Sequence, residues 1–336
     1  MAADPPARRY SCRGGVVTAR KRTLMPAPTS RETCQACGSH GRPIRLTAGD
    51  ESWRPRGCPR CGLRWLASPP TGEALLELYR SGFYEQRAPR ASAIVMTLHR
   101  LNSRLRLMTL REQRPGRMLD IGCGKGHFLA AAREAGWDVR GVDLSAEAVD
   151  YARRTYGLDV RVGDVADLDL DERFDAVTLW HVLEHVADPG ALIERSRSLL
   201  GPGGRLVISV PNAASLQARL AGVHWLHLDI PRHVFHFDLR SIHALLVGRG
   251  FEIERHDTFY PEMELAGLVQ SVLNAAGGER DLIYRFLKQD PTVALNGRVA
   301  TALVAAGLLI PGAAAWSLVA PLLDTGASLQ VVARPV

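Results

Sequence analysis

The hydrophobic pattern of the chain changes period repeatedly between residues 116 and 260. Short apolar runs, such as 118–120 and 174–180, are followed by stretches in which apolar residues recur every three or four positions, as after Phe128. This alternation predicts strands and helices in turn, and therefore an α/β fold with a parallel sheet covered on both faces. Further strands are expected at residues 138–142, 160–162, 205–210, 251–259 and 327–333.

A long helix is predicted ahead of the sheet, from about Ser92 to Arg114, and a shorter one from Glu73 to Tyr79. One apolar stripe runs along the long helix at Ile94, Leu98, Leu101, Leu105 and Met108. Its other face is basic, with Arg100, Arg104, Arg106, Arg111 and Arg114. We interpret this as a solvated face, with contact to substrate phosphates or to an acidic surface as the alternative.

A third pattern lies near the end of the chain, where no charged residue stands between Arg298 and Asp324. Such a stretch is long enough to span a membrane. Pro311-Gly312 interrupts it, and the strand predicted at 327–333 must rejoin the sheet, so a single crossing is excluded. We expect residues 293–323 to form a two-helix hairpin that contacts a membrane, packs on the domain or forms a homodimer interface.

Four of the six cysteines form two matching C-x-x-C pairs, each followed by glycine. The spacing is typical of a zinc ribbon, and four thiolates close a tetrahedral shell that leaves no open position for catalysis. We therefore predict a structural Zn²⁺ bound by Cys34, Cys37, Cys58 and Cys61. Arginines between the two pairs make nucleic-acid binding a further use of such a ribbon.

The net charge of +7 is concentrated at the N-terminus, where the first thirty residues carry six basic residues and one acid. This charged stretch predicts a disordered tail without the apolar core of a secretion signal, so a cytoplasmic location is expected, and Met25 offers an alternative start. The expected divisions are a tail at 1–30, a ribbon at 31–70, a helical linker at 71–115, a sheet domain at 116–260, an apolar helical insertion at 261–325 and a last strand at 326–336.

The first strand of the sheet domain runs into Asp120-x-Gly122-x-Gly124-x-Gly126. Glycines let the backbone approach a ligand closely, and the helix that follows offers free N–H groups and a partial positive charge. A dinucleotide fingerprint would need glycine at position 127, which is histidine. Asp143 and Asp164 follow the second and third strands, where an open sheet binds ligands, and Asp143 is placed to accept hydrogen bonds from ribose hydroxyls.

The glycine loop resembles the S-adenosylmethionine (SAM) loop of class I methyltransferases, and the turn 200–204 matches their Leu-x-Pro-Gly-Gly feature. The resemblance implies SAM as cofactor and a seven-stranded Rossmann-like sheet whose last strand is antiparallel, between the fifth and sixth. It also implies that Asp164 meets the adenine amino group. Independently of the resemblance, we expect the aromatic residues Phe83, Tyr84 and Trp180 to enclose the sulfonium, because a cation is attracted to ring faces. The implied cofactor residues are Asp120, Gly122, Gly124, Gly126, Asp143, Leu144, Asp164, Val165, Trp180 and Tyr84.

The fourth strand leads into His181-Val182-Leu183-Glu184-His185, which resembles the E-x-x-E-H stretch of ubiquinone-biosynthesis O-methyltransferases. There the acids and the histidine are associated with a divalent metal, whereas here His181 replaces the first acid and only Glu184 and His185 match. The Asn/Asp-Pro-Pro-aromatic tetrapeptide of N-methyltransferases is absent, which disfavours a nitrogen acceptor and nucleic acid as a partner. A histidine-rich loop at 224–236 is expected to cover the crevice, with His233 facing the acceptor.

These features predict a SAM-dependent methyltransferase that acts on a hydroxyl or carbon of a sugar, a nucleotide-sugar or another small molecule, as similar zinc-ribbon chains do. A base with a pKa near neutral suits a hydroxyl acceptor, so His181 and His233 are the candidate catalytic residues. Two alternatives remain. One is an RNA methyltransferase that grips phosphates with the ribbon and the arginine-rich helix, and the other is a non-catalytic SAM-fold binding protein.

Overall fold

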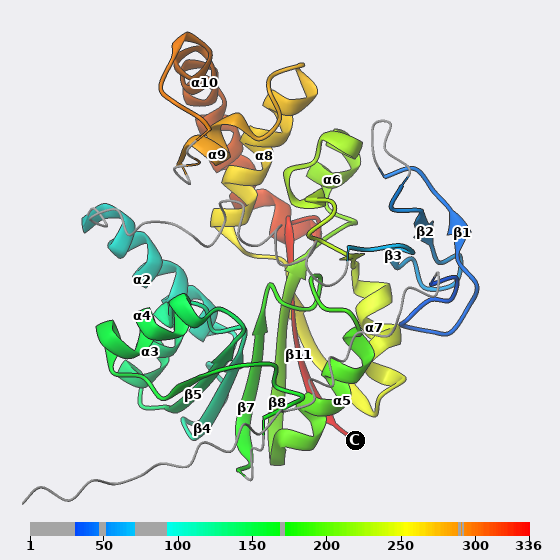
Figure 1. Ribbon diagram of the computed structural model, residues 1–336, viewed down its shortest axis with the longest axis vertical. Helices are drawn as coiled ribbons and strands as arrows, with labels where there is room; N and C mark the ends of the chain where they lie inside the picture. Colours follow the sequence, from blue (N-terminus) through cyan, green and yellow to red (C-terminus); the bar gives the residue numbers. More distant parts are fainter. Residues whose placement is uncertain (1–30, 47–51, 71–92, 169–171, 288–289, 291) are drawn as a thin grey trace, which may run out of the picture.

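A computed structural model describes residues 31–46, 52–70, 93–168, 172–287, 290 and 292–336. Its centre is a seven-stranded sheet in the order β10-β11-β8-β7-β4-β5-β6 (Figure 1). The parallel strands are β4 (Arg117–Ile121), β5 (Asp138–Asp143), β6 (Val160–Val162), β7 (Phe174–Trp180) and β8 (Leu200–Pro211). The last strand, β11 (Ser328–Pro335), is antiparallel and lies between β8 and β10 (Phe251–Asp257), as predicted.

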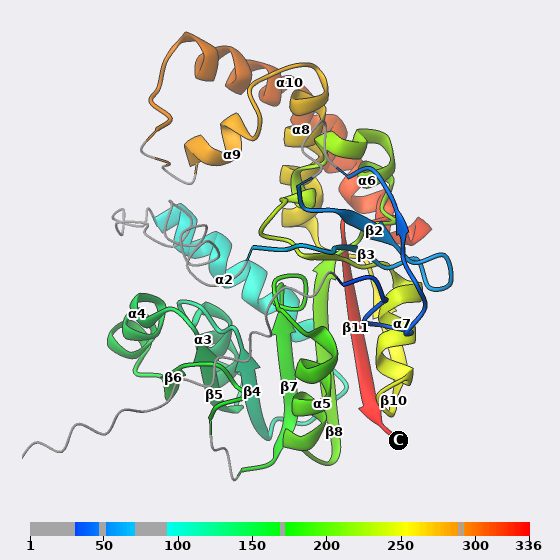
Figure 2. The same ribbon diagram turned by 45° about the vertical axis from the view of Figure 1, so that its right-hand side comes forward.

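Helices cover both faces of this sheet, which Figures 1 and 2 show from two sides. Successive residues of a strand point to opposite faces. Met118 accordingly packs in one core cluster with Leu129 and Val149, while Leu119 packs in the other with Ile193 and Leu245. The first face carries α2 (Ala93–Met108), α3 (His127–Glu134) and α4 (Ala146–Tyr156), and the second carries α5 (Pro189–Leu199) and α7 (Leu239–Val247).

Helix α2 is shorter than predicted, because it ends at Met108 and not near Arg114. The Thr109 hydroxyl donates to the carbonyl of Arg106, and the guanidinium of Arg255 donates to the carbonyl of Thr109. Side chains that bond to these carbonyls replace the next helical hydrogen bonds, so the helix stops there. The predicted helix at 73–79 lies outside the described residues.

The four-cysteine ribbon forms a separate small sheet in the order β1-β2-β3-β9. Its own strands are β1 (Arg42–Pro43), β2 (Pro55–Gly57) and β3 (Arg64–Leu66). The fourth strand, β9 (Phe235–His236), comes from the histidine-rich loop of the sheet domain. The ribbon and the sheet domain therefore share one β-sheet and one hydrophobic cluster, in which Trp65 and Phe237 are both fully buried.

The remaining helices lie beyond the carboxyl end of the central sheet (Figure 1). They are α6 (Leu216–Ala221), α8 (Pro261–Ala275), α9 (Leu282–Leu287) and α10 (Gly297–Val319), with short 3₁₀ turns at Gly222–His224, Leu226–Leu228 and Ala320–Leu323. The predicted hairpin is wrong, since α10 runs through Pro311 as one helix. Proline removes one N–H and crowds the carbonyl four residues earlier, but Pro311 is exposed and packing of Ala306 and Ala313 holds the helix on either side.

Candidate functional site

The glycine loop between β4 and α3 is built for close approach to a ligand. Gly122, Gly124 and Gly126 all have positive φ angles, of 73°, 52° and 74°, which side chains with a Cβ rarely adopt. A Cβ on Gly122 would lie 2.5 Å from Val182, and one on Gly126 would lie 2.6 Å from Leu158. A Cβ on Gly124 would meet no described atom within 4 Å, so the loop leaves open space at its middle glycine.

Asp143 ties this loop to the end of β5. Its carboxylate accepts hydrogen bonds from the N–H groups of Gly124, at 2.7 Å, and Ser145, at 2.8 Å. Burial raises the pKa of this carboxyl. Each oxygen keeps lone pairs for further donors, such as the two hydroxyls of a ribose. The neighbouring Leu144 side chain is 74% exposed, which leaves an apolar surface for a ring beside that ribose.

Asp120 lies beneath the loop and is almost fully buried. It accepts a 2.6 Å hydrogen bond from the hydroxyl of Thr178. Burial is the main cause that raises the pKa of Asp120 to about 7. A carboxyl in this state gains most from a neighbouring cation, and the ammonium group of SAM is such a cation.

The other predicted cofactor residues differ from one another in burial and in contacts. Asp164 is exposed and accepts from the N–H of Ala166 at 2.9 Å, while Val165 is buried beneath it. Trp180 is buried, and its indole N–H meets no acceptor among the described residues. Arg106 of α2 lies over the Trp180 ring, 5.2 Å from its centroid. Tyr84 and Phe83 lie outside the described residues.

His181 stands at the carboxyl end of β7 in a left-handed conformation, with a φ of 56°. Its Nδ1 lies 3.2 Å from a carboxylate oxygen of Glu184, and its Nε2 lies 3.5 Å from the hydroxyl of Ser209. The ring of Tyr260 stands edge-on to it at 5.8 Å. A strained backbone held by such contacts is often found at functional sites. Val182, which follows His181 in the chain, packs against Gly122, so the segment that carries this histidine contacts the glycine loop.

Three potential metal ligands meet behind His181, because ligand atoms of Glu184, His185 and His233 lie within 4.8 Å of one another. The second Glu184 oxygen is buried and meets no partner among the described residues. Nδ1 of His185 lies 3.1 Å from the carbonyl of Arg232, and Nδ1 of His233 lies 2.8 Å from that of His227. A histidine whose Nδ1–H donates to a carbonyl presents Nε2 on the other side of the ring, which is the usual arrangement of a metal-ligating histidine. Nε2 of His233 lies 3.8 Å from a carboxylate oxygen of Asp229. These residues fit a divalent ion.

The histidine-rich loop is more structural than expected. His227 bonds to the carbonyl of Met263 at 3.1 Å, and His236 bonds to that of Leu228 at 2.8 Å. Burial lowers the pKa of both rings to about 4, and it lowers the pKa of His233 well below its ordinary value. All three rings are therefore neutral at pH 7, and the loop is packed into the domain instead of lying over it as a separate cover.

The four ribbon thiols lie where the spacing predicts. Cys34 and Cys61 are 3.5 Å apart at sulfur, as are Cys37 and Cys58, and all four fall in one cluster within 4.8 Å. The N–H of Cys61 points at the sulfur of Cys58, at 3.4 Å. Backbone donors to sulfur stabilise a thiolate, so this cage fits a tetrahedral Zn²⁺.

Backbone hydrogen bonds connect the ribbon to the candidate metal ligands. Leu66 of β3 donates to the carbonyl of Val234, at 3.0 Å, and Val234 donates to the carbonyl of Glu184, at 2.8 Å. This connection could not be predicted from the sequence, because the segments lie far apart along the chain. Thr178, Ser209 and Tyr260 were missed for the same reason. Arg106 belongs to the basic stripe that was interpreted as a solvated face, but it donates to the hydroxyl of Tyr260 at 2.9 Å.

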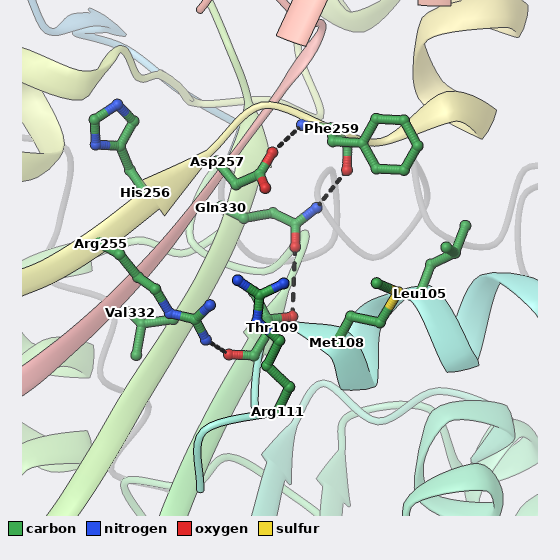
Figure 3. A pocket seen from close by; sticks show the side chains of 10 residues that line it. All are labelled: Leu105, Met108, Thr109, Arg111, Arg255, His256, Asp257, Phe259, Gln330 and Val332. Atoms are coloured by element: carbon green, nitrogen blue, oxygen red, sulfur yellow. Dashed lines mark hydrogen bonds between the residues drawn. The ribbon is translucent and has the colours of Figure 1, made fainter. Parts of the chain in front are cut away.

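A cavity of about 190 Å³ lies away from the glycine loop, between α2 and the strands β10 and β11 (Figure 3). Figure 3 shows Arg255 and Gln330 crossing it toward Thr109. None of the predicted cofactor residues that the structure describes lines this cavity. The candidate site is therefore defined by side-chain geometry at the carboxyl end of the sheet.

Residues 94–256 match a family described as a methyltransferase domain. The strand order matches what the resemblance implied, with an antiparallel last strand between the fifth and the sixth. Residues 94–256 therefore match a methyltransferase domain, and the Rossmann-like sheet has the strand order expected of class I SAM-dependent methyltransferases. An N-terminal four-cysteine cluster that fits a zinc ribbon is joined to this sheet domain.

The particular relatives include ubiquinone biosynthesis O-methyltransferases of Xanthomonas campestris pv. campestris (strain B100) and Xanthomonas oryzae pv. oryzae (strain PXO99A). Each is 38% identical to this chain, over 151 and 152 residues respectively, which is 42% of the chain. The match spans 63% of the length of these curated relatives.

Among solved structures, a SAM-dependent methyltransferase from Archaeoglobus fulgidus is 19% identical, with a TM-score of 0.45, and covers 77% of this chain and 98% of its own. Magnesium protoporphyrin IX methyltransferase from Synechocystis PCC 6803 with bound SAH is 21% identical, with a TM-score of 0.40, and covers 54% of this chain and 86% of its own. These likenesses are too distant to add to the assignment.

Proposed function

We propose that the protein transfers the methyl group of SAM to a hydroxyl oxygen of a small molecule, with His181 as general base. The support for the proposal is the His181–Glu184 pair, which lies in the segment that packs against the glycine loop through Val182. A carboxylate at 3.2 Å from Nδ1 favours the tautomer with a proton on that nitrogen. Nε2 is then unprotonated and can accept the proton of an acceptor hydroxyl.

The reaction we propose is an in-line displacement. The acceptor oxygen forms a bond to the methyl carbon while the carbon–sulfur bond breaks, and the electron pair of that bond stays on sulfur. The sulfonium becomes a neutral thioether, and the acceptor proton passes to His181. Most of the rate would come from holding the two reactants in line in a site with little water. The cofactor would be held by the open middle of the glycine loop, Asp143 and Asp120.

A divalent ion at Glu184, His185 and His233 is a further part of the proposal. The support is the buried Glu184 oxygen, which meets no partner in the described part of the chain, and the two histidines whose Nδ1 atoms are bonded to carbonyls. Such an ion polarises an oxygen that binds to it and lowers the pKa of a hydroxyl. This assignment makes His233 a ligand, and it leaves His181 as the catalytic base.

For the acceptor we propose a class of hydroxyl compounds and not a single molecule. The printed name of the relatives refers to ubiquinone biosynthesis, and a phenol-type hydroxyl or a sugar hydroxyl would suit the same base. We propose that the enzyme is cytoplasmic and acts on such an acceptor, free or nucleotide-linked. The support for a hydroxyl acceptor is the imidazole of His181 in the segment that contacts the glycine loop. This description does not require nucleic acid.

The test is methyl transfer from isotopically labelled SAM onto sugars, nucleotide-sugars, phenols and RNA, preceded by calorimetry with SAM alone. We expect SAM binding, and label on an oxygen of a small hydroxyl compound. Label on RNA would replace the proposed acceptor. SAM binding without transfer to any extract of the native host would favour a binding protein, and absence of SAM binding would refute the proposal.

A further inference from the structure

Helix α10 and the turn after it form the most unusual surface of the described chain. Among the described residues, the segment Gly297–Leu323 alone is long and apolar enough to cross a membrane, with a mean hydropathy of 1.9. Only 17% of its most apolar window is buried. Its first half lies at the outer edge of the molecule in both views, and its second half runs past α8 toward β11 (Figures 1 and 2). A core helix of a soluble protein would be mostly buried, so this helix needs another explanation.

One narrow seam of α10 packs against the rest of the protein, and beside it the indole N–H of Trp316 donates to the carboxylate of Glu264 at 3.0 Å. Val299, Ala306, Ala313 and Ala320 recur at every seventh position and are all buried. Ala306 and Ala313 share a hydrophobic cluster with Val269 of α8. A seven-residue repeat of this kind is one stripe of a helix packed against a neighbour. The seam therefore explains how α10 is held, but not why the other positions are apolar.

The positions outside the seam are apolar over a wide arc. At 100° per residue, the exposed side chains cover about 180° of the helix circumference. A helix whose outer face meets water normally carries polar or charged residues there. The exposed side chains in this arc are Leu303, Val304, Leu308, Ile310, Leu318 and Val319.

The fold restricts how a membrane could meet this helix. The insertion leaves the sheet after β10 and returns as β11, and these two strands are paired, so α10 alone cannot cross a bilayer. Helix α8 cannot supply a second crossing, because polar residues attach it to the soluble domain. Ser271 accepts from the N–H of Leu226 at 2.9 Å, and Asn274 donates to the carbonyl of His224 at 3.1 Å. A bilayer can therefore be met only by a helix lying flat on it.

A second copy of the chain fits the same surface less well. A two-fold contact between two α10 helices would cover one additional stripe of each and leave the rest of the arc in water. A lipid bilayer can cover every exposed side chain of a wide apolar arc at the same time. We propose that α10 lies in the interfacial plane of a lipid bilayer, with its seam on α8 and its outer arc at the level of the upper acyl chains.

The proposal predicts an unusual dependence on salt. Arg298 and Asp324 bound the helix, and no charge lies between them. Binding that depends on apolar burial is insensitive to screening, unlike binding through a basic patch. We therefore expect association with neutral phosphatidylcholine vesicles that persists in about 0.5 M salt.

Vesicle flotation with the full chain tests this inference. The variant Leu308→Asp/Leu318→Asp should weaken vesicle binding by roughly a hundredfold or more, since two large apolar side chains become charged. The matched control is Val247→Asp, a similarly exposed apolar residue on α7 that should leave binding unchanged. Thermal unfolding and SAM binding, measured on all three proteins, establish that the variants are folded.

Three results would overturn the inference: no flotation of the wild-type protein, equal flotation of the α10 variant, or equal loss in the Val247→Asp control. Light scattering tests the other possible occupant of this face, which is a second copy of the chain. A wild-type dimer that becomes a monomer in the α10 variant, without vesicle binding by either, would show that a second copy covers this face. None of these results depends on methyl transfer, so the inference can fail while the proposed function stands.

Discussion

The two halves of the candidate site are built in different ways. The cofactor half takes Asp120, the glycine loop and Asp143 from consecutive strand–loop units of one parallel sheet. The acceptor half takes His181 from β7, Ser209 from β8 and Tyr260 from the segment after β10. Its candidate metal ligands include His233, which precedes a strand that completes the cysteine ribbon.

This difference separates cofactor binding from acceptor chemistry. In the cofactor half, short-range hydrogen bonds such as those of Asp143 hold the geometry within neighbouring loops. In the acceptor half, the geometry depends on packing between segments far apart in the chain, including the ribbon. Substitutions in the cofactor half should change SAM affinity, whereas substitutions in the acceptor half should change turnover. Four predictions test that separation, from the largest expected effect to the smallest.

The first prediction concerns the ribbon. Cys61→Ser removes one of four thiolates, and the ribbon should lose several kcal/mol of folding free energy because bound metal supplies most of it. Strand β9 then loses its partner β3, so turnover should collapse while SAM affinity changes by less than about threefold. Elemental analysis, calorimetry and hydrogen exchange at 64–66 and 234–236 measure these effects. Cys12→Ser is the matched control, and a zinc-replete, fully active Cys61→Ser protein would contradict the prediction.

The second prediction concerns the base. His181→Asn should lower kcat by about 10²–10⁴-fold, because the acceptor proton loses its base. Asparagine tolerates the left-handed backbone at this position, so the fold should be kept. The dissociation constant of SAM should not change. Steady-state kinetics and calorimetry measure both, with the exposed His243→Asn as control. A parallel loss of SAM affinity would mean that the two halves are not separate.

The third prediction concerns the cofactor half. Asp143→Asn places an amide N–H₂ against the N–H of Gly124 or Ser145, which leaves a buried donor unpaired. It also removes an acceptor for ribose. SAM affinity should fall by about tenfold to a hundredfold, as measured by calorimetry. The control is Asp138→Asn, an exposed acid at the start of the same strand. If the control weakens SAM binding equally, the specific role of Asp143 is refuted.

The fourth prediction is a pH dependence from Asp120, whose pKa is raised to about 7 by burial. Below that pH the carboxyl is protonated and attracts the SAM ammonium less, so affinity should fall by up to about tenfold per pH unit. The folded protein without SAM holds this proton more tightly than the unfolded chain. Its stability should therefore decline as the pH rises from about 4 to about 7. Asp120→Asn should flatten both profiles, and unchanged profiles would exclude Asp120 as their cause.

The cofactor half was largely predictable because its chemistry is local in the chain. Glycines with left-handed backbones and acids after successive strands can be read without knowing what packs against them. The ribbon cysteines are predictable for the same reason, since thiolates at fixed spacing need a common ion. The apolar stretch near the end was recognised, but the break expected at Pro311 did not occur, because packing against α8 overrides the local preference.

The sequence by itself determined the sheet, the glycine loop with its acids, and the cluster of four thiols, because each depends on residue types at short, fixed separations. Only the tertiary structure decided that the ribbon shares a strand with the histidine loop and that Glu184, His185 and His233 converge. It also decided that half of the circumference of α10 stays apolar and exposed. The physical reason is that such contacts depend on which segments, distant in the chain, pack against each other. Hydrophobic periodicity indicates only that one face of a segment is buried, not what covers it.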